Sequence, residues 1–266
     1  MNELALYPGL GAPLASILCG WRTVAYVEHD AYCVRVLLER IEEGHIPAAP
    51  IWDDARTFDG RPWRDVVDIV TAGFPCQPFS VAGRRQGESD ERNLWPDTLR
   101  IIREVGPRYV FLENVPGLLS SGYFGTIFGD LAESGFDAEW GVLSAAAVGA
   151  PHLRKRLWIL ADSEGVQRER LLGSAADRVL SENVPDPVCV RRHGRQDDEG
   201  AEAPCGGRPE AWSSGCGWWS SEPGVGRLAH GVAHRVDRLR ALGNGWVPAV
   251  AAGAWRELMR RARERT

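Results

Sequence analysis

Short apolar runs alternate with stretches of helical spacing along residues 1–161. Runs of Val, Ile and Leu without polar interruption are typical of strands buried on both faces. The pattern predicts strands at 4–7, 23–27, 66–72, 109–113 and 157–161, and helices at 13–19, 31–42, 98–105 and 247–259. Strands that alternate with helices favour an α/β fold, with a mostly parallel sheet and helices on both faces.

Residues 162–234 differ from the rest of the chain. They are rich in Gly, Pro and Ser, their periodicity is weak, and they hold twelve acidic side chains against eight arginines. From residue 235 onward eight arginines face three acids, and we expect residues 260–265 to form a basic tail. The chain is thus predicted to consist of a main domain at 1–161, a small irregular region at 162–234 and a C-terminal segment at 235–266 that returns to the main domain.

The composition of the 266 residues is that of a globular protein, with 44% hydrophobic and 25% charged residues. No apolar run reaches the roughly 18 residues of a membrane span, and the first residues do not resemble a signal peptide. We therefore expect a cytoplasmic monomer that does not bind membranes. The six cysteines are too sparse for a disulfide framework. Since the net charge is −5, contact with nucleic acid must come from local patches.

A glycine turn follows the first predicted strand, at residues 7–12 (YPGLGA). Glycines in a strand-to-helix turn allow a ligand to approach the backbone. Glu28 ends the second predicted strand, about 20 residues later, where an acid can bind ribose hydroxyls. Together, the turn and the acid favour a nucleoside cofactor, NAD or S-adenosylmethionine, over an ordinary tight turn.

Two groups suited to covalent catalysis follow buried strands. Cys76 lies in AGFPCQPFS, where two prolines stiffen a loop at the carboxyl edge of the sheet. That position fits a small buried hydrophobe poorly, which is how we interpret Cys19 and Cys33. Glu113 ends the next buried strand at the same edge, and a thiol beside an acid can act as nucleophile and general acid.

Two polar segments complete the set. Alternation places His152, Arg154 and Arg156 on one face at the start of the strand at 157–161. They could hold phosphate or a carbonyl of a base, and a solvated strand end is the alternative. Residues 243–245 (GNG) are, by composition, a turn before the last helix.

Taken together, these motifs resemble the cytosine-C5 DNA methyltransferases in order and approximate spacing, over residues 1–161 and about 235–260. The segments that carry the resemblance are 7–12, 73–80, 113–115, 152–156 and 243–248, and Pro-Cys-Gln and Glu-Asn-Val are the most specific. The resemblance implies a Rossmann-like fold that uses S-adenosylmethionine. It also implies methylation of C5 of a flipped-out cytosine in duplex DNA, as in restriction-modification, through a covalent bond from Cys76 to C6.

The resemblance assigns roles to individual residues. Cys76 would be the nucleophile, Glu113 would contact N3 and the exocyclic amine, and Arg156, supported by Arg154, would bind O2. The residues expected to bind the cofactor are Tyr7, Gly9, Gly11, Glu28, His29, Asp53, Phe74, Pro75 and Asn244. Those expected to contact DNA are Gln77, Ser80, Arg84, Arg85, Arg92 and His152. No metal is expected in the reaction.

The chain departs from the family pattern at Pro8, Ala12, His152 and Trp246, and in the short region 162–234. That region would have to recognise the DNA target, with 191–195, Trp212, Trp218 and Trp219 as candidate contacts. A surface insertion is the alternative. Cys189, His193, Cys205 and Cys216 could bind zinc, although a close C-x₂-C pair is missing.

Two other functions remain open at this stage. One is methylation of RNA, or another modification at C5, on the same scaffold. The other is a DNA-binding protein without turnover, against which the presence of Cys76, Glu113 and Arg156 argues.

Overall fold

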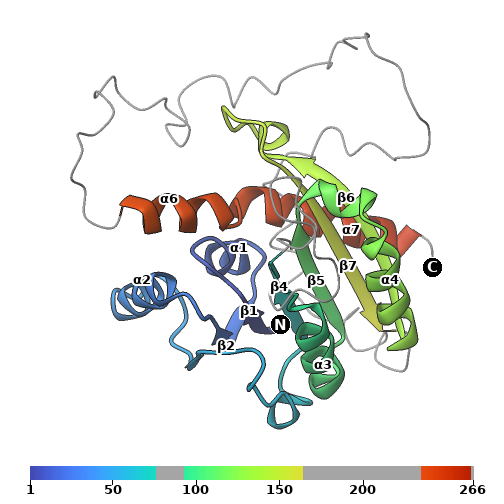
Figure 1. Ribbon diagram of the computed structural model, residues 1–266, viewed down its shortest axis with the longest axis horizontal. Coiled ribbons are helices and arrows are strands. Elements are labelled where there is room, and N and C mark those ends of the chain that lie inside the picture. Colours follow the sequence, from blue (N-terminus) through green and yellow to red (C-terminus); the bar gives the residue numbers. More distant parts are fainter. Residues whose placement is uncertain (76–92, 164–234, 265–266) are drawn as a thin grey trace.

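The computed structural model describes residues 1–75, 93–163 and 235–264 (Figure 1). Its centre is a seven-stranded sheet in the order β3-β2-β1-β4-β5-β7-β6. The strands are β1 (Asn2–Leu6), β2 (Arg22–Val27), β3 (Ile51–Trp52), β4 (Ile69–Ala72), β5 (Tyr109–Asn114), β6 (Phe136–Ser144) and β7 (Lys155–Ser163). The first five are parallel, and β7 is antiparallel to both β5 and β6. The expected mostly parallel α/β sheet is confirmed.

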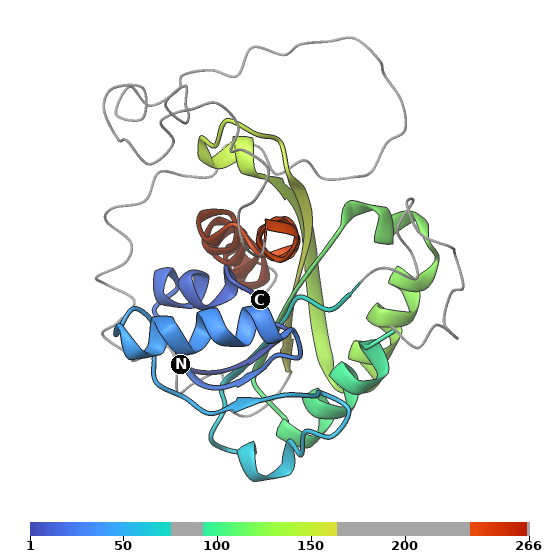
Figure 2. The same ribbon diagram turned by 60° about the vertical axis from the view of Figure 1, so that its left-hand side comes forward.

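Helices cover both faces of this sheet (Figure 2). Val110 and Leu112 of β5 pack with the residues of α3 (Trp95–Val105) and α4 (Tyr123–Glu133). On the opposite face, Tyr109 and Phe111 pack with α1 (Ala12–Leu18) and α7 (Pro248–Glu264). Leu37 of α2 (Ala31–Glu42) packs against β1 and β2 on this second face. Burial on both faces is the reason that the strands appear in the sequence as continuous apolar runs.

Local sequence sets several boundaries. Asp30 caps α2, because its carboxylate accepts the backbone N–H groups of Tyr32 and Cys33. Pro96 lies in the first turn of α3, and Gly106, at φ +60°, ends that helix. The helix α6 (Arg235–Asn244) directly precedes α7 and is drawn above α1 and α2 in Figure 1. There Ala241 packs against Leu10 and Cys33, which confirms Cys33 as a packing residue.

Several predicted boundaries were wrong. The strand predicted at 66–72 begins only at Ile69, because Asp65 has a positive φ and the N–H of Val66 is bonded back to Trp63 in a turn. The predicted basic tail is instead the last turn of α7. Arg260 and Arg261 are ion-paired with Glu257 there, and Arg260 also with Glu264. These arginines are therefore partly neutralised by their own helix.

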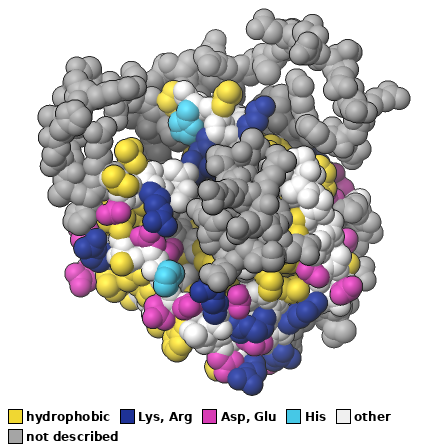
Figure 3. All heavy atoms as spheres, viewed as in Figure 1, with side chains coloured by type: hydrophobic (Ala, Val, Ile, Leu, Met, Phe, Trp, Pro, Cys, Tyr) yellow, Lys and Arg dark blue, Asp and Glu magenta, His cyan; other side chains and the backbone are white. Residues whose placement is uncertain are grey.

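The surface charges are mixed in sign. On the face drawn in Figure 3, Lys and Arg side chains are interspersed with Asp and Glu over the lower part of the molecule. That part of the face has no single sign of charge. None of the helices in the described ranges is long and apolar enough to cross a membrane.

Candidate active site

The direction of β7 brings distant parts of the sequence together at one edge of the sheet. Since β7 is antiparallel to β5, its first residues lie beside the last residues of β5. The pairing sets Asn114 opposite Leu157, and Glu113 opposite Trp158. Arg156 thereby reaches the carboxyl edge of the parallel strands, which is the edge where ligands of open α/β sheets bind.

Glu113 and Arg156 form a buried ion pair at this edge. The Nε of Arg156 lies 2.7 Å from Oε1 of Glu113, whose side chain is 9% exposed. Oε1 nevertheless accepts no hydrogen bond from the described residues, so the N–H does not point along a hydrogen-bond direction. Burial raises the pKa of Glu113 to about 7, against the opposing effect of Arg156 and Arg154. This acid can therefore carry a proton near neutral pH.

Arg154 serves a different purpose from Arg156. Its guanidinium donates to the backbone carbonyls of Gly243 and Gly245. Its φ of +23° interrupts the extended chain, and β7 starts only at Lys155. The prediction that His152, Arg154 and Arg156 share one face of a strand is therefore wrong. His152 lies exposed before the strand, and Arg154 fixes the loop that follows α6.

The loop after β4 leads toward Cys76. The side-chain amide of Asn114 donates to the carbonyl of Phe74 at 3.3 Å, so this loop is tied to the end of β5. The ring of Phe74 is buried, with its centroid 5.4 Å from that of Trp95. Phe74 can thus meet a ligand only through its backbone, whereas Pro75 is half-buried.

The glycine turn after β1 is bound to the end of β2. Tyr7 and Gly9 have φ values of 53° and 50°, the left-handed conformation that glycine adopts easily. Glu28 accepts the N–H of Gly9 at 2.9 Å and that of Asp30 at 2.8 Å. Because a carboxylate has about four acceptor positions, Glu28 can still accept from a further donor, and burial raises its pKa.

These features place a glycine turn, a strand-end acid and a buried Glu–Arg pair along one sheet edge. The sequence profile of one family, the C-5 cytosine-specific DNA methylases, matches residues 6–188. The chain belongs to this family.

The relatives of this chain agree with that assignment. It is 38% identical over 159 residues to the type II methyltransferase M.NgoMIV of Neisseria gonorrhoeae, an alignment that covers 57% of this chain and 48% of the relative. Over 166 residues it is 33% identical to M.HhaI of Haemophilus parahaemolyticus, with coverages of 60% and 48%. The chain spans about half the length of these curated relatives.

Solved structures show the same fold. A putative DNA modification methyltransferase encoded in an Escherichia coli prophage superposes with a TM-score of 0.52 at 22% identity, covering 71% of this chain and 52% of the other. The Dnmt2 methyltransferase of S. pombe gives 0.50 at 22% identity, with coverages of 72% and 59%. The Rossmann-like methyltransferase fold expected from the sequence is confirmed.

Gly11 has a packing requirement that the sequence did not predict. A Cβ at this position would stand 2.0 Å from the carbonyl oxygen of Trp246. The loop between α6 and α7 therefore requires that residue 11 has no side chain, and the expected contact of Gly11 with the cofactor stays a prediction. Asn244 ends α6, exposed, between the two glycines that Arg154 holds.

Sequence reasoning treated Trp246 only as a departure from the family pattern. In the structure Trp246 is 6% exposed, with edge-on ring contacts to Phe111 and Trp158. Its Nε1 has no hydrogen-bond partner in the described part and lies 2.7 Å from the point where a Cβ of Gly73 would stand. Trp246 thus forms part of the floor of the site, beside Glu113. The Oε2 atom of Glu113 lies 3.6 Å from the same Cβ position of Gly73.

The second strand and the short β3 form the far side of the edge. His29, which is exposed, has its Nδ1 3.0 Å from the carbonyl oxygen of Asp53. A pocket of about 350 Å³ adjoins them, lined by Glu28, Val34, Leu38, Ala49, Pro50, Ile51 and Asp53. Three residues that the sequence predicts to bind the cofactor, Glu28, His29 and Asp53, therefore lie close together.

The remaining predicted residues lie outside the described ranges of the chain. These are the nucleophile Cys76, the DNA contacts Gln77, Ser80, Arg84, Arg85 and Arg92, and the target-recognition candidates at 191–195, Trp212, Trp218 and Trp219. The zinc candidates Cys189, His193, Cys205 and Cys216 also lie there. Among the described residues, no group of three potential metal ligands is found.

Proposed function

We propose that this chain transfers a methyl group from S-adenosylmethionine to C5 of cytosine in duplex DNA. The observation that carries the proposal is the buried Glu113–Arg156 pair, which lies beside the loop that leads to Cys76. Membership of the family supports a cytosine as the substrate. The region at 162–234 is assigned the choice of DNA sequence, because it is the part of the chain without a catalytic motif.

Each group of the pair matches an edge of cytosine. Protonated Glu113 can donate to N3, and its other oxygen can accept from the 4-amino group. Arg156 can donate to O2. The base reaches these groups only when it leaves the double helix, at a cost of a few kcal/mol.

The reaction then follows from the chemistry of the groups. The thiolate of Cys76 adds to C6 while Glu113 supplies a proton to N3, so that C5 becomes an enamine carbon and takes up the methyl group. A base removes the C5 proton, the bond to C6 breaks so that the thiolate leaves, and N3 returns its proton to Glu113. The cofactor supplies the electrophilic methyl group.

The described residues fit such a cofactor. Glu28 can accept from ribose hydroxyls, and it lines the adjoining pocket together with Asp53, whose carbonyl contacts His29. Tyr7 and Gly9, in the glycine turn, would line the methionine side, which Asn244 would close, and Pro75 lies in the loop that leads to Cys76. Gly11 supports this wall through Trp246.

A trapping experiment tests the function. Duplex DNA methylated by the wild-type chain is first mapped by bisulfite sequencing, and 5-fluorocytosine is placed at a mapped site. Because fluorine cannot leave as a proton, Cys76 should stay joined to C6 through denaturing electrophoresis, provided that S-adenosylmethionine is present. The substitution Cys76→Ser should abolish both the adduct and methylation, while Cys33→Ser keeps both.

Three outcomes would overturn the proposal. Label transferred only to transfer RNA would establish RNA as the substrate. Binding of DNA without transfer would indicate a silent homologue. Methylation by Cys76→Ser would exclude the covalent route.

A further inference from the structure

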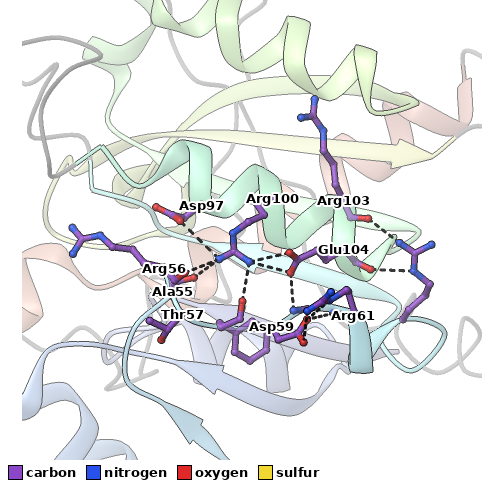
Figure 4. Close-up of polar contacts among 12 residues, drawn as sticks. Ala55, Arg56, Thr57, Asp59, Arg61, Asp97, Arg100, Arg103 and Glu104 are labelled. Carbon is purple, nitrogen blue, oxygen red and sulfur yellow. Dashed lines mark hydrogen bonds and ion pairs between the residues drawn. The ribbon is translucent and has the colours of Figure 1, made fainter.

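Arg100, near the middle of α3, is bound to the segment that follows β3 (Figure 4). Its Nη1 donates to the carbonyl of Phe58 at 2.9 Å, and its Nη2 to that of Ala55 at 2.7 Å. A weaker contact, at 3.4 Å, reaches the carbonyl of Arg56. One guanidinium therefore holds several main-chain carbonyls of an irregular segment.

Glu104, one turn further along α3, completes this arrangement. Its carboxylate accepts from Nη1 of Arg100 at 3.0 and 3.1 Å. The same carboxylate accepts the N–H of Gly60 at 2.8 Å, and Gly60 has no room for a Cβ, which would stand 2.9 Å from that of Glu104. Arg100 thus donates to backbone carbonyls within residues 55–60, and Glu104 accepts a backbone N–H of the same segment.

This segment is the continuation of the cofactor side of the sheet edge. It starts directly after Asp53, whose carbonyl contacts His29, and Asp54 caps its first turn by accepting the N–H of Arg56. Because β3 has only two residues, the sheet itself gives Asp53 little support. On the same helix, Thr98 is 3.3 Å from the hydroxyl of Tyr7 in the glycine turn.

We propose that Arg100 is a positioning residue for the adenosine side of the cofactor site, an inference that rests on the proposed function. It acts through residues 53–60 and does not itself touch the ligand. The planar fork of the guanidinium suits this task, because two nitrogens bond two carbonyls at fixed separation. A lysine has a single nitrogen and cannot reproduce that geometry.

The chain offers a matched control on the same helix. Arg103 is an α3 arginine whose Nε donates to Ser134 at 2.8 Å, and in Figure 4 its side chain points away from the network around Arg100. Replacing it removes a guanidinium of equal size and charge without releasing residues 55–60.

Calorimetric titration of the full chain tests the proposal. The two probes are S-adenosylhomocysteine and methylthioadenosine, which has the adenosine half without the amino acid. We expect Arg100→Met to weaken both by about tenfold or more and by the same factor, since the loss lies on the adenosine side. Arg100→Lys should give an intermediate loss, and Arg103→Met should stay within about twofold of wild type.

The outcomes separate the inference from the proposed function. If the wild-type chain binds neither probe, the cofactor assignment fails. If it binds both but Arg100→Met binds them equally well, or if only S-adenosylhomocysteine is weakened, the positioning role is wrong. Should Arg100→Met not fold, Arg100→Lys decides. Weakening of both probes by the same factor supports the proposal, and a folded Lys variant with unchanged affinity overturns it.

Discussion

At the scale of single residues, Glu113 has the most informative ionisation. Burial raises its pKa to about 7, above the ordinary 4.5, so the native chain binds a proton that the unfolded chain releases. Its contribution to stability is thus fully present below pH 4.5 and is lost as pH rises through 7. We expect wild type to lose roughly 2–3 kcal/mol relative to Glu113→Gln between pH 5 and 8, measured by denaturant unfolding.

The same substitution should impair chemistry. An amide cannot transfer a proton to N3, so single-turnover methylation should fall by about 10²-fold or more while DNA affinity is retained. If the free energies of unfolding of wild type and Glu113→Gln change with pH in the same way between pH 5 and 8, Glu113 is charged over that whole range. Loss of DNA affinity with unchanged turnover would make it a binding residue only.

Gly11 allows a prediction about packing. In Gly11→Ala the new Cβ meets the carbonyl of Trp246 at 2.0 Å, and a backbone group cannot move aside easily. We expect a loss of about 2–3 kcal/mol in the free energy of unfolding. Gly117→Ala is the control, because nothing lies within 4 Å of its Cβ and its change should be within about 0.5 kcal/mol. Equal stabilities for the two variants would refute this account.

At the scale of elements, Arg154 joins the start of β7 to the loop after α6. Arg154→Met should loosen the carbonyls of Gly243 and Gly245, and so lower the affinity for S-adenosylhomocysteine by about tenfold. Arg156→Met should leave that affinity within about twofold and reduce methyl transfer instead. Calorimetry together with single-turnover rates separates these roles. If both variants change affinity and rate in the same way, this division of roles is wrong.

Sequence patterns predicted the buried strands and the helices that carry a clear apolar stripe. The strand β6 was missed because it is the edge strand and its FDAEWGVLS pattern is only half-buried. The two residues of β3 are too short for any periodicity. Two glycines in α4, Gly125 and Gly129, obscure its helical signal.

The sequence predicted those parts of the candidate site that consist of polar side chains at strand ends. Glu28, Glu113 and Arg156 lie at one edge because strand ends determine their position. The network of Arg100 was missed because its partners are backbone carbonyls, which leave no mark in a sequence. The packing of Gly11 against Trp246 was missed for the same reason, since its neighbour there is a backbone carbonyl.

At the scale of the whole molecule, α7 ties the C-terminal segment to the sheet. Trp255 is 9% exposed and packs edge-on against Trp21, Tyr109 and Phe111. We expect Trp255→Ala to cost about 3–5 kcal/mol and to lower the midpoint of a single unfolding transition. Arg260→Ala, on the exposed side of α7, should cost less than about 1 kcal/mol. Separate transitions would show that α7 folds independently of the sheet.

The meeting of Gly11 with Trp246 also has a consequence for synthesis of the protein. The turn at residues 7–12 is synthesised long before the loop that backs it at Trp246. Closing so long a stretch of chain is slow compared with local helix formation. A nascent or prematurely stopped chain that lacks Trp246 therefore has a glycine turn without its backing, and translation must pass this residue before the turn can pack as it does in the folded chain.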